Sequence, residues 1–180
     1  MKKFMNVLII ALALTAHALP AASSSAASTQ PVAQKYSTRL FKAVEDNQMF
    51  KVSKLIKNGA HLLAQNAEGF TALYAAVLYN NIECVEAIIY YAQEQNILNE
   101  VLNAQTRGMK QTPLHAAAAM NHEACALALL AAGANTTLEN EMGRTPAQHG
   151  RNNDYTELAT IIENYKKEPI EEKSKKCIIC

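Results

Sequence analysis

The stretch Thr112-Pro113-Leu114-His115-Ala116-Ala117 decides how this 180-residue chain is organised. A threonine side chain caps the start of a helix, and proline is tolerated in the first turn, where its missing N–H breaks no helical hydrogen bond. The small side chains from Ala116 to Ala119 allow a second helix to approach closely. The stretch therefore predicts the start of a short, closely packed helix.

Three other segments repeat this pattern in the same register. They begin at Thr38, Thr71 and Thr145, so the four threonines are spaced by 33, 41 and 33 residues. Gly133 ends the third unit and is expected to terminate its second helix in a left-handed conformation. An apolar residue stands seventeen positions after each threonine, namely Leu55, Ile88, Leu129 and Ile162.

This pattern resembles the ankyrin repeat, whose period is 33 residues and whose signature Thr-Pro-Leu-His-x-Ala is complete from Thr112 to Ala117. The resemblance covers residues 36–165 and implies an all-α solenoid with short hairpin fingers. It implies about four helix-turn-helix units, near 36–66, 67–104, 105–138 and 139–165. The framework residues that it implies are Thr38, Thr71, Thr112, Pro113, His115, Gly133 and Thr145.

Three departures from the period are informative. The second unit holds eight extra residues, which we place in Tyr91–Leu102 and interpret as an extended second helix or a new helical turn. The finger before the third unit has Lys110 where the other fingers have Gly69 and Gly143, so its turn must differ. The fourth unit departs from the motif from Ala147 to Gly150, as terminal repeats do when one face meets water.

Composition excludes several classes of function. The net charge is +1, so the chain lacks the strong basic surface that nucleic-acid binding needs. It has no phosphate-binding loop and no nucleophile elbow. We therefore predict that the protein is not an enzyme and takes no cofactor and no small-molecule substrate.

The histidines and cysteines fit structural roles. No two histidines have the spacing of a zinc peptidase, which argues against a metal site. The resemblance implies that His115 hydrogen-bonds the threonine framework. Cys84 and Cys125 occupy the same position in adjacent units, about 8–10 Å apart if the helices pack normally. This separation is too long for a disulfide, so we predict two buried, unpaired thiols.

The first residues have the order of a secretory signal peptide. Lys2 and Lys3 precede the apolar run Val7–Leu14, and Ala16-His17-Ala18 has the small residues of a cleavage site. We therefore assign residues 1–22 to a signal peptide, cleaved near 18–22, and 23–35 to a flexible linker. This assignment predicts a secreted or periplasmic protein.

The last residues, Cys177-Ile178-Ile179-Cys180, have three interpretations. The first is a prenylation box with the lipid on Cys177, supported by lysines immediately upstream. The second is a thiol–disulfide pair of Cys177 and Cys180. The third is chance. Residues 166–180 are charged, which predicts a disordered tail able to reach a modifying enzyme.

The two ends combine into one hypothesis about function. Prenyl transfer takes place in a eukaryotic cytosol, whereas a signal peptide exports the chain from its own cell. A bacterium inside a eukaryotic host satisfies both, and the chain then resembles host-directed effectors that are tethered to host membranes. The alternative is an unlipidated periplasmic or extracellular scaffold that binds a bacterial partner.

The resemblance also implies where a partner binds. Ankyrin domains generally use their fingers and the adjoining inner helices to bind another protein. Specificity rests on the exposed side chains of these elements, because a fold does not define its ligand. The partner-binding residues that we predict are Phe70, Leu78, Tyr79, Met109, Lys110, Met120, Met142 and Arg144.

Overall fold

The computed structural model describes residues 30–165, with side chains from residue 34 onward. The predicted signal peptide, most of the predicted linker and the tail with Cys177 lie outside the described residues. The described part is all-α, with one isolated bridge between Gln65 and Thr71, as predicted for the solenoid. Its helices are α1 (Gln30–Glu45), α2 (Met49–Lys57), α3 (Ala72–Leu78), α4 (Ile82–Glu94), α5 (Leu98–Asn103), α6 (Pro113–Met120), α7 (Glu123–Ala132), α8 (Pro146–Arg151) and α9 (Thr156–Asn164).

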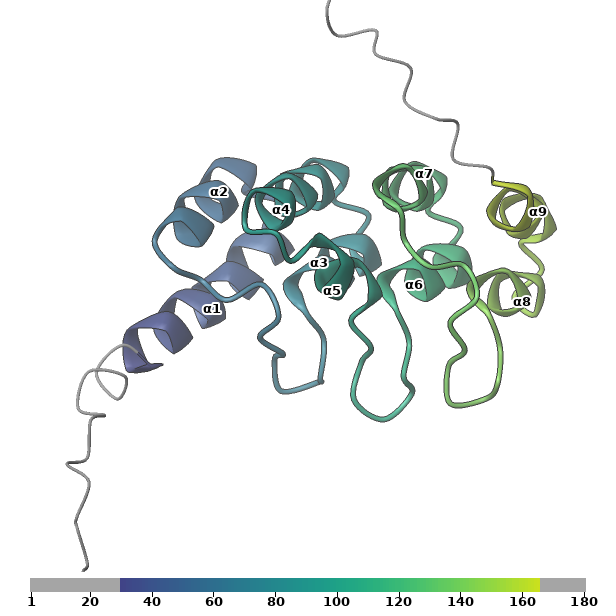
Figure 1. Cartoon of the computed structure of the whole chain (residues 1–180), viewed down its shortest axis with the longest axis horizontal. Helices are drawn as coiled ribbons and strands as arrows, with labels where there is room; N and C mark the ends of the chain where they lie inside the picture. The colour runs from purple at the N-terminus through teal and green to yellow at the C-terminus, as the bar shows by residue number, and fades with distance from the viewer. Residues whose placement is uncertain (1–29, 166–180) are drawn as a thin grey trace, which may run out of the picture.

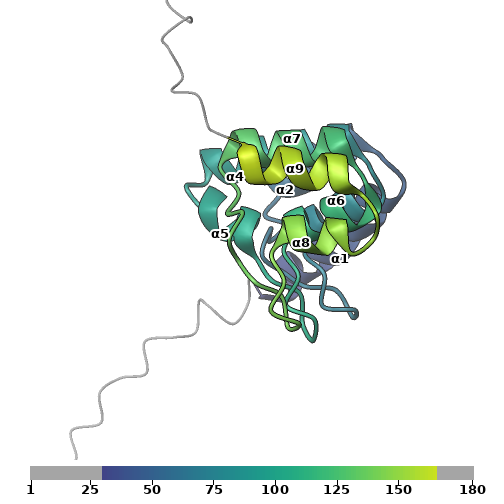
Figure 2. The same ribbon diagram turned by 90° about the vertical axis from the view of Figure 1, so that its right-hand side faces the viewer.

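The helices form two layers with the fingers on one side. Helices α1, α3, α6 and α8 make the inner layer, and α2, α4, α7 and α9 make the outer layer (Figure 1). Three hairpin fingers project from the inner layer, away from the outer helices (Figure 2). Among the described residues, no helix has the length and hydrophobicity needed to span a membrane.

Threonine caps start three of the four inner helices. The side chain of Thr71 accepts a hydrogen bond from the N–H of Tyr74, and Thr112 and Thr145 make the same bond in their units. Each cap pairs one of the backbone N–H groups that a helix start leaves without a partner. These three threonines therefore act as helix caps in the structure.

The first unit differs from the prediction. Thr38 lies inside α1, where its hydroxyl donates to the carbonyl of Gln34 at 3.1 Å, and α1 begins at Gln30. The predicted linker, 23–35, thus overlaps the helix, and Thr38 is not a cap. The physical reason is local composition, because residues 32–36 include good helix formers and Pro31 lies in the first turn.

A second repeated position ends the inner helices. Nine residues after each threonine the backbone turns left-handed, a conformation that asparagine and aspartate tolerate better than most residues. The φ values lie between 49° and 67°. The threonine-based repeat pattern does not predict this position, although the same type of residue recurs there. The four residues are Asn47, Asn80, Asn121 and Asp154.

The eight extra residues of the second unit are divided among three places. Helix α4 runs one turn longer than its equivalents and is followed by Asn96, which has a φ of 56° and takes the place of Gly59 and Gly133. Three more residues form part of α5, whose Val101 and Leu102 are buried. Both interpretations of the Tyr91–Leu102 segment are therefore correct, for seven of the eight residues.

The eighth extra residue lies in the second finger. That finger closes with a hydrogen bond from the N–H of Thr106 to the carbonyl of Gln111, one residue wider than the bond from Asn66 to Phe70 in the first finger. Lys110 has a φ of 51° beside Gly108 at 79°. The second turn differs, as expected.

Small and aliphatic side chains fill the space between the layers. Ala116 and Ala117 are buried where α6 meets its neighbours, and Gly150 lies close to Ala118, since an added Cβ would be 3.2 Å from its carbonyl oxygen. Cys84 and Cys125 are buried and form no disulfide, which confirms that prediction. Burial raises the pKa of the Cys125 thiol to about 11, so this thiol stays protonated.

Candidate partner-binding surface

His115 connects the third unit to the finger of the fourth. Its Nδ1 accepts the N–H of Thr112 at 3.2 Å, so the ring proton is on Nε2, which donates to the carbonyl of Arg144 at 2.9 Å. The side chain is fully buried, and this burial lowers its pKa. The neutral imidazole therefore holds the base of the third finger against α6.

Hydrogen bonds between neighbouring fingers join them into one surface. The amide of Gln65 donates to the carbonyl of Gln105 at 2.9 Å, and the amide of Gln105 donates to the carbonyl of Glu139 at 3.1 Å. Between the second and third fingers, the N–H of Glu141 donates to the carbonyl of Met109 at 2.9 Å. The fingers therefore present their side chains at fixed spacing.

A first hollow lies where α1, the first finger and α3 meet. Phe41 and Phe70 line it, and the Phe70 ring packs on Tyr74 with the ring centroids 4.7 Å apart. Tyr79 closes one side, where its hydroxyl donates to a carboxylate oxygen of Glu45 at 3.2 Å. The hollow thus combines an apolar floor with a charged edge, where Lys42 pairs with Glu45.

A second hollow lies on the inner helices, between α3 and α8. Leu78 and Met120 contribute apolar surface, and the side chain of Met120 is 50% exposed. The polar wall comes from a chain of groups across three units. The Tyr74 hydroxyl donates to Gln111 at 2.7 Å, and the Gln111 amide lies 3.5 Å from the His149 ring.

The ring of His149 is fixed from its other side by the third finger. The amide nitrogen of Asn140 lies 3.2 Å from its Nδ1, while the Asn140 oxygen accepts N–H groups of that finger. Burial, and then the charge of Arg144, lowers the pKa of His149. A neutral ring therefore faces the hollow, where it can exchange hydrogen bonds with a polar ligand.

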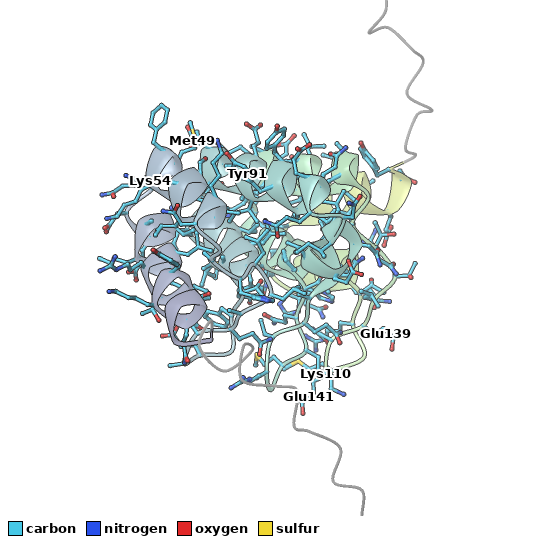
Figure 3. All side chains as sticks on the ribbon, turned by 60° about the vertical axis from the view of Figure 1, so that its left-hand side comes forward. Met49, Lys54, Tyr91, Lys110, Glu139 and Glu141 are labelled. Atoms are coloured by element: carbon cyan, nitrogen blue, oxygen red, sulfur yellow. The ribbon has the colours of Figure 1, made fainter. Side chains whose placement is uncertain are left out.

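The predicted partner residues fall into separate groups on this surface. Phe70 and Tyr79 line the first hollow, Leu78 and Met120 line the second, and the exposed Met109, Lys110 and Met142 lie on the fingers. Figure 3 shows Lys110 at the finger ends, with Glu139 and Glu141 close by.

Arg144 is half-buried and engaged within the protein. Its guanidinium donates to the side-chain oxygen of Asn152 at 2.9 and 3.0 Å, with the Asn152 amide turned to accept both bonds. Phe41, Gln111 and His149 also line the hollows, and the repeat motif did not predict them there. The positions of Gln111 and His149 in the repeat, next to Thr112 and four residues after Thr145, could have indicated that they face the inner side. The hollow that they share depends on how the units stack.

The buried polar side chains of the described residues are satisfied within the protein. Within residues 34–165, no three histidine, cysteine or acidic side chains gather in a way that would hold a metal ion. The buried side-chain nitrogen and oxygen atoms of this part all have hydrogen-bond partners. The observed polar groups stabilise the shape and leave the two hollows and the finger tips facing outward.

Comparison with protein families identifies the repeats. Residues 40–89 match the family model "Ankyrin repeats (many copies)", and residues 109–141 match "Ankyrin repeat". These segments include the inner helix α3, the finger at Met109–Lys110 and the signature at Thr112. The chain contains ankyrin repeats. Ankyrin repeats form a non-catalytic scaffold and indicate a protein–protein interaction module.

Similar proteins match part of the ankyrin-repeat chain. It is 30% identical over 96 residues to the inactive serine/threonine-protein kinase TEX14 of Mus musculus, covering 53% of this chain and 6% of that protein. It is 28% identical over 124 residues to ankyrin repeat and SOCS box protein 2 of Homo sapiens, covering 62% and 18%. The putative ankyrin repeat protein FPV024 of fowlpox virus is 27% identical over 108 residues, covering 59% and 17%. The chain thus spans less than a fifth of the length of these relatives.

Proposed function

We propose that this ankyrin-repeat protein binds an extended segment of a partner protein along the two hollows and the finger tips. The observation that carries the proposal is the pair of neighbouring hollows on the inner face, each combining apolar side chains with fixed polar groups. Tyr79 and Met120 are the exposed apolar residues at their edges. Such a pattern supports binding because a few apolar anchors supply most of the energy of an interface.

The proposal is tested by placing a photo-crosslinking amino acid at single sites. At Met120 it is expected to yield a discrete crosslinked partner in cells that contain the partner. At Tyr90, which is 57% exposed on the outer helix α4, it is expected to yield none. The double variant Tyr79→Ala/Met120→Ala removes both anchors and should lower the yield from a third site, Met142. Equal crosslinking from Tyr90 and Met120 would contradict the proposed surface.

The proposal also includes export and a lipid on Cys177. Its support is in the sequence outside the described residues, namely the apolar run Val7–Leu14 after two lysines and the residues Cys177 to Cys180 after several lysines. A protein exported by a bacterium into a eukaryotic host would meet the prenyl transferase there. In this account, the lipid holds the protein at a host membrane while the fingers bind a host protein.

The lipid is tested by the intact mass of residues 30–180 produced in a eukaryotic cytosol, beside a Cys177→Ser control. We expect the chain with Cys177 to gain the mass of a prenyl group and the Cys177→Ser control to gain none. An unchanged mass would remove the lipid and leave the alternative of an unlipidated exported scaffold. Crosslinking at Met120 does not depend on this outcome, so the two parts of the proposal fail separately.

A further inference from the structure

The outer face of α2 differs in charge from the rest of the outer layer. Helix α2 exposes Lys51, Lys54 and Lys57 and contains no acidic residue. The outer helices α4, α7 and α9 contain acidic residues and no basic one. Positive charge on the outer layer is therefore confined to the N-terminal end of the solenoid.

The same segregation extends over the whole described chain. Residues 30–62 carry six basic and two acidic residues, whereas residues 63–165 carry four basic and eleven acidic ones. Residues 30–62 thus have a formal charge of +4 and residues 63–165 a formal charge of −7, whereas the full 180-residue chain carries +1. An anionic surface attracts one end of such a molecule and repels the rest, which fixes its orientation.

An aromatic ring projects from the basic face. Phe50 is 85% exposed, more than any other large hydrophobic side chain in residues 34–165. The spacing of Phe50, Lys54 and Lys57 places them on one face of the helix. Lys51 and Lys54 form no ion pair with the described residues, while Lys57 lies 5.8 Å from the centroid of the Tyr91 ring. Figure 3 shows Lys54 on this helix, at the opposite side of the molecule from Lys110 on the fingers.

We propose that this face, Phe50 with Lys51, Lys54 and Lys57, binds an anionic lipid membrane. A single protruding ring with lysines on the same helix suits the bilayer interface, although Glu83 of α4 lines the hollow beside Phe50 and Lys51. The interface accepts the ring without a matching pocket while the lysines extend to the phosphates. A protein interface needs a contiguous apolar centre, and α2 exposes no large apolar side chain besides Phe50.

The proposed contact is compatible with the partner-binding surface. The fingers project away from the outer layer, so they remain free when α2 contacts a membrane (Figure 1). The described chain ends at Tyr165 after the outer helix α9, and Cys177 follows twelve residues later. Twelve fully extended residues span at most about 40 Å, which limits how far a lipid on Cys177 could lie from the end of α9. The contact through α2 does not require that lipid.

The test uses the full chain without prenylation, produced in bacteria, and sedimentation with vesicles. Phosphatidylcholine vesicles are compared with mixed phosphatidylcholine–phosphatidylserine vesicles. We expect tighter binding to the mixed vesicles. Lys54→Glu should weaken this binding by about 25-fold, since each charge near an anionic surface contributes about fivefold and the reversal changes the charge by two. Phe50→Ser should lose about tenfold through the missing ring. Residues outside 30–165 are common to all variants, so their contribution cancels.

The matched control is Arg107→Glu, which makes the same change in total charge on an exposed residue of the second finger. It should bind the mixed vesicles within about twofold of the unmodified chain. Equal losses for Arg107→Glu and Lys54→Glu would overturn the proposal, because total charge and not the α2 face would then govern binding. Equal binding to both kinds of vesicle would also overturn it. Unchanged thermal midpoints establish that the variants are folded.

Discussion

At the scale of single residues, one histidine determines how two units are joined. His115 satisfies a backbone N–H of its own unit and a backbone carbonyl of the next finger. In the last unit Gln148 takes the first role, because its side-chain oxygen accepts the N–H of Thr145 at 3.0 Å. The fourth unit has no following finger to hold among the described residues, which explains why glutamine suffices there.

This comparison predicts unequal effects of two substitutions. His115→Ala should destabilise the protein by about 2–4 kcal/mol, since it leaves a cavity and two buried backbone groups without partners. His115→Gln should lose about half as much, because glutamine can still accept the N–H of Thr112. Urea unfolding measures both. Equal losses would show that the bond to Thr112 contributes nothing.

Stability should also depend on pH through the buried histidines. Burial lowers the pKa of His115 and of His149 below 6.5, so the unfolded chain binds protons that the folded chain does not. The stability that the two neutral histidines contribute is fully present above pH 6.5. It is lost as the pH falls from 6.5 through their lowered pKa values in the folded protein. Urea midpoints at a series of pH values test this. His115→Gln should flatten the curve between pH 7 and 5, and an unchanged slope would contradict the assignment.

At the scale of elements, the fingers are limited by how closely they pack. Gly69 and Gly143 occupy equivalent positions with φ values of 81° and 67°. A Cβ on Gly69 would lie 2.6 Å from the Cβ of Arg107 in the next finger, whereas a Cβ on Gly143 would meet nothing closer than 4.0 Å. The two glycines therefore share a backbone requirement, and only Gly69 adds a packing requirement.

Substituting each glycine by alanine separates the backbone effect from the packing effect. Gly143→Ala should cost about 1 kcal/mol, for a left-handed residue with a side chain. Gly69→Ala should cost at least about 1 kcal/mol more, because the second finger must move. Thermal and urea unfolding give the difference, and chemical shifts around Arg107 should change only in the Gly69 variant. Equal costs would mean that the fingers do not constrain each other.

Most elements were predictable from the sequence, and the exceptions have physical causes. The caps at Thr71, Thr112 and Thr145 depend on local chemistry, so the repeat pattern predicted them. The start of α1 was missed because Thr38 follows the repeat pattern although the residues before it favour helix. The place where α4 ends depends on whether Asn96 or an earlier residue turns left-handed, and local sequence does not decide that.

The candidate surface was less predictable than the elements. Exposure of Met109, Met120 and Met142 follows from their positions in the repeat, and the structure places all three at the surface. The second hollow includes Gln111 and His149, which belong to two units. Its shape therefore depends on how closely the units stack. Arg144 has the position of a partner-binding residue, but its guanidinium is engaged by Asn152.

At the scale of the whole molecule, the stack makes stability depend on position. Each unit contacts mainly its neighbours, so the end of the solenoid can open without the centre. Helix α4 packs against α2, α3, α5 and α7, whereas the main contacts of α9 are with α7 and α8. Ile88 in α4 and Ile162 in α9 stand at the same position of their units, and both are buried. Substitutions at these two positions therefore compare the centre of the solenoid with its end.

Ile88→Ala and Ile162→Ala should each lower the free energy of unfolding by about 2–5 kcal/mol, because each truncates a buried side chain. We expect the two variants to differ in which helices lose protection from amide exchange. Ile162→Ala should speed amide exchange in α8 and α9 and leave α3 and α4 protected, because opening the last unit exposes only its own interface. Ile88→Ala should speed exchange throughout, since separation at α4 divides the stack. Native-state hydrogen exchange measures this. A uniform loss of protection in Ile162→Ala would instead show that the four units unfold as one.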